Sequence, residues 1–188
     1  ATLDAIAELL AEKPRFDHRT VLHHFGVSTQ AQCRRAAALG CAIQANGYYL
    51  RFFGDQYVAE GLGTERASQM TRVGSARRNG MSVALHSDLP MGPLEPLLAA
   101  SIMATRLSGS GVVFAPEERL SMYDAIAAVT IEAAWQLFLD HEIGSLAAGK
   151  LADVTVLEED PFEVDPAVWP DIDIRATMLS GRVYPLPV

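Results

Sequence analysis

Histidine and carboxylate side chains stand at the ends of short apolar segments in the first half of the chain. His23 and His24 close one such segment, and Asn46 closes a second. His86 and Asp88 lie at the end of a third. Imidazole and carboxylate groups both ligate Zn²⁺, and both carry protons in general acid and base catalysis. This set of residues therefore predicts either a metal site or an acid–base site.

The spacing alone leaves simpler explanations open. A single histidine at a strand end is more often a structural residue than a ligand, and Asp88, which precedes Leu89-Pro90, could simply cap a turn. The chain has no His-x-His or His-Glu-x-x-His motif. Residues two apart in a strand face the same side, so we expect His86 and Asp88 to point into one cavity.

Three strands of a parallel sheet are expected to carry these residues. Apolar runs that include β-branched residues predict strands at 19–24, 41–46 and 82–88. Helical periodicity predicts helices between and after them, at 2–13, 28–39, 67–78, 95–107 and 116–139. Alternating strands and helices indicate a parallel sheet whose sites lie at the carboxyl ends of the strands.

Two further segments differ in composition and pattern from the strands and helices above. Residues 47–66 are rich in glycine and aromatic residues, and we expect an elaborated loop that either lines a pocket or packs as a surface excursion. After Gly144 the pattern becomes all-β, with strands predicted at 152–157, 174–179 and 182–184. Because an eight-stranded barrel takes about 250 residues, the βα part is expected to be only a portion of one.

The composition is that of a globular, acidic protein. The 188 residues include 15 Lys and Arg against 23 Asp and Glu, a net charge of −8, and 49% of them are hydrophobic. This balance argues against a nucleic-acid partner, and no run of about 18 apolar residues predicts a membrane span. We expect a cytoplasmic protein whose two cysteines, Cys33 and Cys41, are buried packing residues.

Several segments resemble the amidohydrolase superfamily of metal-dependent hydrolases. Residues 143–161 (IGSLAAGKLADVTVLEEDP), followed by 175–184 (RATMLSGRVY), are similar to the C-terminal signature of that superfamily. Residues 121–134 resemble its preceding helix, and 86–91 (HSDLPM) resemble its eighth-strand segment. The most similar branch includes N-substituted formamide deformylases.

The resemblance implies an α/β fold: the C-terminal part of a TIM (β/α)8 barrel, about strands six to eight with their helices, plus strands of a small β-sandwich. Residues 1–142 would form the partial barrel and 143–188 the sandwich strands. The strand at 19–24 would be strand six, with His23 as its metal-associated histidine. His24 replaces His23 in that role if the register shifts by one residue.

The resemblance also implies a divalent metal, with zinc as the first choice and one or two ions in the complete enzyme. His23 and Asp88 would be both metal ligands and catalytic residues, with Asp88 carrying the proton. His24, Asn46 and His86 are candidates for substrate contact. Other ligands of the superfamily, such as the histidine pair of strand one, have no counterpart here. Because a catalytic metal needs about three ligands, the isolated chain is expected to be inactive.

The function expected is hydrolysis of a non-peptide, amide-type C–N bond of a small molecule by a metal-activated water. The alternative is a non-catalytic assembly half that pairs with itself or with a companion chain through its open sheet edge. We accordingly expect a homo-oligomer or a missing N-terminal half.

Overall fold

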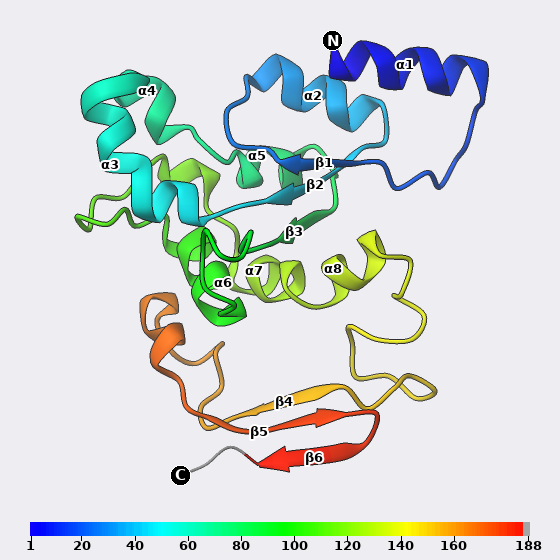
Figure 1. The fold of residues 1–188 in the computed structure, drawn as a ribbon, viewed down its shortest axis with the longest axis vertical. Helices are drawn as coiled ribbons and strands as arrows, with labels where there is room; N and C mark the ends of the chain where they lie inside the picture. The colour runs from blue at the N-terminus through cyan, green and yellow to red at the C-terminus, as the bar shows by residue number, and fades with distance from the viewer. Residues whose placement is uncertain (186–188) are drawn as a thin grey trace.

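The expected parallel sheet is present and has three strands. In the computed structural model, which describes residues 1–185, the strands are β1 (Val21–His24), β2 (Ala42–Ala45) and β3 (Val83–Leu85). Both strand pairs are parallel, in the order β1-β2-β3, and the register aligns residues 23, 44 and 84. The carboxyl ends of the strands therefore meet along one edge of the sheet (Figure 1).

Helices connect the strands and follow the last of them. Before β3 the α-helices are α1 (Thr2–Glu12), α2 (Gln30–Ala38), α3 (Gly54–Gln56), α4 (Gly63–Ser68) and α5 (Val73–Arg78). After β3 come α6 (Pro96–Thr105), α7 (Met122–Ala128) and α8 (Ile131–Gln136). In Figure 1, α7 and α8 lie between the parallel sheet and the C-terminal strands. None of the helices described is long and apolar enough to cross a membrane.

Three of the expected helix and loop segments are wrong in detail. The helix predicted at 67–78 is interrupted, because α4 ends at Ser68 and α5 begins at Val73. The helix predicted at 116–139 is divided into a 3-10 turn, η3 (Pro116–Glu118), and the helices α7 and α8. Between α7 and α8, Thr130 has a φ of −128° and a ψ of −99°, so helical hydrogen bonding stops there. The loop predicted at 47–66 is largely helical, with the π-helical turns η1 (Tyr49–Phe53) and η2 (Tyr57–Gly61) on either side of α3.

Small apolar residues and buried sulfur atoms fill the core between the sheet and its helices. Ile43 and Val83 of the sheet are essentially inaccessible to solvent, as is Ala36 of α2. Cys33 and Cys41 are buried free thiols, which confirms their prediction as packing residues. Burial raises the pKa of both thiols, so neither is a reactive thiolate at neutral pH.

The C-terminal strands form a separate antiparallel sheet, as predicted. It contains β4 (Val154–Leu157), β5 (Ile174–Leu179) and β6 (Arg182–Pro185), in that order. The 3-10 segment η4 (Pro166–Asp171) packs on α6 and buries Trp169 completely. This segment anchors the sheet to the helices (Figure 1). Within residues 1–185 the strands make a single layer, so the second layer of the expected sandwich is not present.

Candidate metal centre

Three histidines converge at the carboxyl edge of the parallel sheet. The His23 ring stacks on the His86 ring with their centroids 4.3 Å apart. The centroid of the His24 ring lies 4.2 Å from that of His23 and 4.8 Å from that of His86. One potential ligand nitrogen from each residue lies within 4.8 Å of the other two. Neutral imidazole is the commonest metal ligand in proteins, so this histidine cluster is a candidate metal centre.

The backbone at the end of β1 explains how two consecutive histidines meet. Adjacent residues of a regular strand point to opposite faces, which would separate His23 from His24. His24 instead has a φ of +65°, and Phe25 follows with a φ of +45°. Such conformations cost about 1–3 kcal/mol each and concentrate at functional sites. The departure from strand geometry allows both rings to face the same space, which strand alternation could not predict.

Gln44 and Tyr49 contact the ring nitrogens of two of these histidines. The Nδ1 atom of His23 lies 2.7 Å from Oε1 of Gln44, its neighbour in the β1–β2 register. An amide oxygen only accepts hydrogen bonds, so this contact places the proton on Nδ1 and leaves Nε2 with a free lone pair. The Tyr49 hydroxyl lies 3.5 Å from Nδ1 of His24. Metal-ligating histidines are commonly oriented in this way through their second nitrogen.

His86 is partly buried and carries an unsatisfied polar atom. Its Nε2 is inaccessible to solvent and has no hydrogen-bond partner among the described residues. Burial lowers the pKa of His86 to about 4, with further contributions from His23 and His24 and opposition from Asp88. The imidazole is therefore neutral at pH 7, the form that binds metals. Buried polar atoms in proteins are almost always satisfied, so this nitrogen has room for one further partner, such as a water molecule or a metal ion.

Asp88 is not a member of the histidine cluster, and the side chain of Asn46 has a different partner. The strand predicted at 82–88 ends at Leu85, and Asp88 is an exposed turn residue with a φ of +56°. The expectation that strand alternation aligns His86 with Asp88 is therefore wrong, because residues 86–88 are not in the strand. Asn46 is fully buried, and its Oδ1 accepts a hydrogen bond from the backbone N–H of Tyr48 at 3.0 Å. That bond shapes the turn after β2.

The two remaining histidines have other surroundings. His18 bonds through its ring nitrogens to the Thr20 hydroxyl at 2.7 Å and to the Leu39 carbonyl at 2.9 Å. His141 is exposed and lies 3.2 Å from a carboxylate oxygen of Glu142. His18 is thus held by hydrogen bonds within the fold and His141 is exposed, and neither is a member of the histidine cluster.

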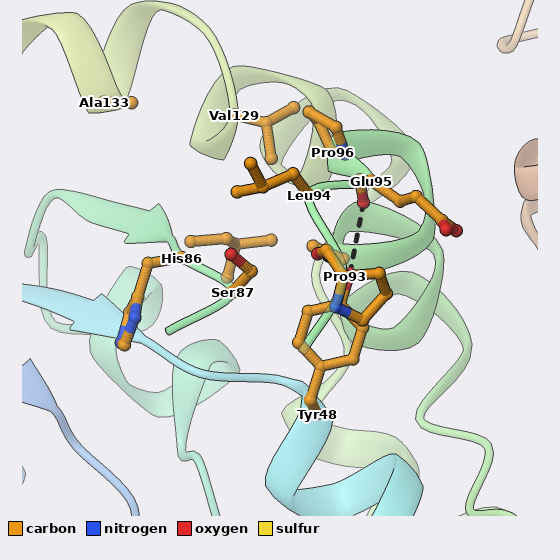
Figure 2. A pocket seen from close by; sticks show the side chains of 11 residues that line it. Tyr48, His86, Ser87, Pro93, Leu94, Glu95, Pro96, Val129 and Ala133 are labelled. Atoms are coloured by element: carbon orange, nitrogen blue, oxygen red, sulfur yellow. Dashed lines mark hydrogen bonds between the residues drawn. The ribbon is translucent and has the colours of Figure 1, made fainter. Parts of the chain in front are cut away.

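An apolar cavity of about 270 Å³ lies beside β3. Its walls include His86 and Ser87 and a set of mostly apolar residues: Tyr48, Leu85, Pro93, Leu94, Pro96, Ala99, Val129 and Ala133. Figure 2 shows the His86 ring directed away from Val129 and Pro96. The Tyr48 hydroxyl donates to the Pro93 carbonyl at 3.1 Å, and burial raises the pKa of Tyr48 to about 12. His86 therefore belongs both to the wall of this cavity and to the histidine cluster.

A second hollow, of about 660 Å³, lies beside β1 at the opposite side of the sheet. It is lined by residues of α1, β1 and α2, among them Leu3, Leu22, His23 and Arg35. Since β1 and β3 are the outer strands of the sheet, each has an edge without a strand neighbour among residues 1–185. A hollow thus accompanies each open edge.

A row of aromatic rings runs outward from the histidine cluster. The Tyr49 ring centroid is 5.9 Å from that of His24, and the Phe53 centroid is 6.5 Å from that of Tyr49. Tyr57 continues the row at 6.3 Å from Phe53. Phe53 and Tyr57 are 36% and 37% exposed, so the row offers apolar surface next to the histidines.

Gln44 and Tyr49 are site residues to which the sequence assigned no role. Gln44 has a signal that could have found it, because parallel pairing of the two predicted strands sets it opposite His23. Tyr49 lies in the segment predicted as a loop, whose helical fold was not evident from the sequence.

Comparisons with known proteins agree on one family. The sequence pattern that describes the amidohydrolase family matches residues 1–185. The chain is 37% identical over 134 residues to the protein LONG AFTER FAR-RED 3 of Arabidopsis thaliana, covering 68% of this chain and 22% of that protein. It is 26% identical over 160 residues to the N-substituted formamide deformylase of Arthrobacter pascens, covering 85% of this chain and 30% of that enzyme.

A solved structure shares the fold. It is an uncharacterized metal-dependent hydrolase from Pyrococcus horikoshii OT3, with a TM-score of 0.70 and 20% identity. The superposition covers 87% of this chain and 33% of that structure. The chain spans about a fifth to a third of the length of these proteins. The family match along nearly all of the sequence shows that the chain belongs to the amidohydrolase family.

Proposed function

We propose that the chain forms part of the active site of a metal-dependent enzyme that hydrolyses an amide-type, non-peptide C–N bond of a small molecule. The observation that carries this proposal is the convergence of three histidines at the carboxyl edge of the parallel sheet in a member of the amidohydrolase family. In this proposal residues 1–142 supply strands six to eight of a TIM barrel, and 143–188 supply strands of its small β-sandwich. Further chain, or another chain, completes the barrel.

The histidine cluster fits a divalent metal, for which we propose zinc. Such an ion acts as a Lewis acid and lowers the pKa of water. His23 would hold it through Nε2, because Gln44 keeps the proton of that ring on Nδ1. A cytoplasmic location is proposed with this function, since buried free cysteines are typical of a reducing compartment.

Asp88 is the proposed proton carrier and the second metal-associated residue in the complete enzyme. Its exposed carboxylate lies in the turn that follows β3, close enough to His86 to act on the pKa of that ring. It would accept a proton from the attacking water and deliver it to the leaving nitrogen. His24 and His86 would contact the substrate from the same space, and Asn46 would support them from the end of β2.

The proposed substrate carries an apolar or aromatic substituent on its amide nitrogen. The row formed by Tyr49, Phe53 and Tyr57 supports this choice, because it exposes apolar surface within reach of the histidines. The similarity to an N-substituted formamide deformylase supports the same class. N-substituted formamides with benzyl or alkyl groups are therefore the first compounds to assay.

The test is the Asp88→Asn variant of this chain within the completed barrel, assayed with these formamides and added Zn²⁺. We expect kcat to fall by about 10²–10⁴-fold, the usual contribution of a general acid or base. Asp171→Asn is the control. It changes an exposed residue at the end of η4 and should retain full turnover. Near-normal turnover in Asp88→Asn, with circular dichroism unchanged, would remove Asp88 from the mechanism.

The open edges of β1 and β3 favour a second candidate function, a non-catalytic half that assembles with another chain. Unpaired strand edges are templates for pairing, and each edge here lies beside a hollow. In that case the chain would contribute structure rather than catalytic groups, and the Asp88 variant would not change the activity of the assembly.

A further inference from the structure

We infer that Arg106 is a positioning residue for His24, and that it acts through one peptide group and the turn that follows β1. The consequence for catalysis rests on the proposed function, in which His24 contacts the substrate. The position of the His24 ring, however, is measurable without turnover and without metal. The inference therefore concerns how the fold holds one ring in place.

Arg106 directly follows α6 and is fully buried, although arginine is rarely found without solvent contact. Its guanidinium donates hydrogen bonds to four main-chain carbonyl oxygens: Phe114 at 2.7 Å, Ser68 at 2.9 Å, Met70 at 2.7 Å and Thr71 at 2.9 Å. Burial lowers the pKa of Arg106 to about 10, so the group is still charged at neutral pH. A buried cation thus holds three carbonyls at the connection between α4 and α5.

The peptide group that joins Met70 to Thr71 contacts Arg106 through one atom and Gly26 through another. Its carbonyl oxygen accepts a hydrogen bond from Arg106, and its N–H donates to the Gly26 carbonyl at 2.8 Å. Hydrogen bonds in such a chain polarise one another, so the charge of Arg106 strengthens the bond to Gly26. The connection between α4 and α5 is thereby fastened to the turn beyond the carboxyl end of β1 (Figure 1).

The segments on both sides of this hydrogen bond have unusual backbone conformations. Thr71 has a φ of +54°, which is rare for a β-branched residue, and its buried hydroxyl has no partner within residues 1–185. On the other side, His24 and Phe25 have φ values of +65° and +45° directly before Gly26. Such conformations persist only where the surrounding structure holds them. The position of the His24 ring therefore depends on the bonds that Arg106 makes.

His23 and His86 are held in a different way. His23 belongs to β1, whose register with β2 is set by strand pairing, and the His86 N–H donates to the Ala45 carbonyl at 3.1 Å. Their rings stack with centroids 4.3 Å apart. Loss of the Arg106 contacts should thus release His24 and leave the other two rings stacked. A general loss of stability would not produce that pattern.

The experiment is NMR spectroscopy of the 188-residue chain without metal, with nuclear Overhauser effects (NOEs) measured between the histidine rings. The parent chain should show NOEs for all three ring pairs, whose centroids lie 4.2, 4.3 and 4.8 Å apart. In Arg106→Lys, the NOEs from His24 to the other two rings should be lost, because an ammonium group cannot reproduce the planar set of donors. The NOE between His23 and His86 should remain.

Chemical rescue tests whether the guanidinium itself is needed. Arg106→Ala should lose the same His24 NOEs, and added methylguanidinium should restore them by entering the space left by the side chain. Methylammonium at equal concentration should not, since it lacks the planar donors. If neither variant folds, the parent chain still provides a test, because a scalar coupling through the hydrogen bond from the Thr71 nitrogen to the Gly26 carbonyl carbon should be present.

Arg77→Ala is the matched control. Arg77 is another guanidinium with several hydrogen bonds, but it donates to Asp124 and Glu132, away from the turn after β1. This variant should lower the Tm and leave all three ring NOEs in place. Circular dichroism and thermal unfolding report on the folding of each variant.

Four results would overturn the inference. They are unchanged His24 NOEs in a folded Arg106 variant, simultaneous loss of all three ring NOEs in such a variant, equal loss of the His24 NOEs in Arg77→Ala, and no coupling between Thr71 and Gly26 in the parent chain. None of these measurements involves turnover. An inactive completed barrel would leave the role of Arg106 standing, and a His24 ring independent of Arg106 would leave the proposed hydrolysis open.

Discussion

At the scale of single residues, hydrogen bonding decides which nitrogen of a histidine is available for chemistry. The register of β1 and β2 sets Gln44 beside His23, and their side chains meet at 2.7 Å. The bond holds the ring and keeps the proton on Nδ1. Gln44 is thus a positioning residue, which acts on a metal only through His23.

Replacing Gln44 should separate this role from simple packing. We expect Gln44→Leu to weaken Zn²⁺ binding by about 10–100-fold, the range found for outer-shell partners of ligands. Gln44→Glu keeps an oxygen that accepts the Nδ1 proton, so it should restore most of the affinity. Competition titration measures the Zn²⁺ affinity of both variants. Equal losses in the two variants would show that Gln44 does not act through its acceptor oxygen.

At the scale of elements, Arg19 joins the segment before β1 to the end of α8. Its guanidinium donates to the Trp135 carbonyl and to the Asp140 carboxylate, both at 2.6 Å, and to Asp17 at 2.9 Å. The same group lies 4.5 Å from the ring centroid of Trp135 and 4.4 Å from that of Phe138. Hydrogen bonds and cation–π contacts thus connect segments more than 100 residues apart in the chain.

Arg19→Met should lower the Tm by several degrees at pH 7, and the deficit should depend on pH. Hydrogen bonds from Arg19 hold the pKa of Asp17 and of Asp140 below the usual value. A carboxyl group whose pKa is lowered by folding stabilises the protein above its unfolded pKa of about 3.9. That contribution disappears as the pH falls through the lowered pKa.

Calorimetric Tm values between pH 7 and pH 3 provide the measurement. The difference between the parent chain and Arg19→Met should be constant near neutrality and shrink below about pH 4. The part of the Tm difference that comes from the aromatic contacts should persist at low pH, because these contacts do not titrate. Arg15→Met, at a nearby exposed arginine, is the control and should leave Tm unchanged. A deficit that grows at low pH would contradict the carboxylate explanation.

At the scale of the whole molecule, the parallel sheet has two open sides. β1 and β3 have free edges, and hollows of about 660 and 270 Å³ lie beside them. The C-terminal sheet also exposes apolar side chains, including Val156, Leu179 and Val183. Surface of this kind favours association with another chain or with further parts of the same fold.

We therefore expect the isolated chain to self-associate at micromolar concentration. Multi-angle light scattering should give a mass above the 20.3 kDa of one chain. Val21→Lys places a charge on the free edge of β1 and should shift the mass toward the monomer. Val168→Lys replaces an exposed valine of η4 and is the matched control, so it should leave the mass unchanged. A monomeric parent chain would argue against self-pairing of the sheet.

The amino-acid sequence by itself determined the local elements and the candidate chemistry. Apolar runs located the six strands of residues 1–185 to within a few residues, and the polar residues at their ends included each histidine of the cluster. The segments that resemble amidohydrolases pointed to the family that the comparisons confirm. These features are local, because backbone preference and side-chain periodicity are set by neighbours along the chain.

Only the tertiary structure decided which of these residues meet. His23 and His86 are 63 positions apart, and parallel pairing through β2 brings their rings together. A positive φ places His24 beside them, and the early end of β3 leaves Asp88 in an exposed turn. Strand register and backbone departures of this kind depend on packing between distant segments. Periodicity along the sequence does not encode that packing.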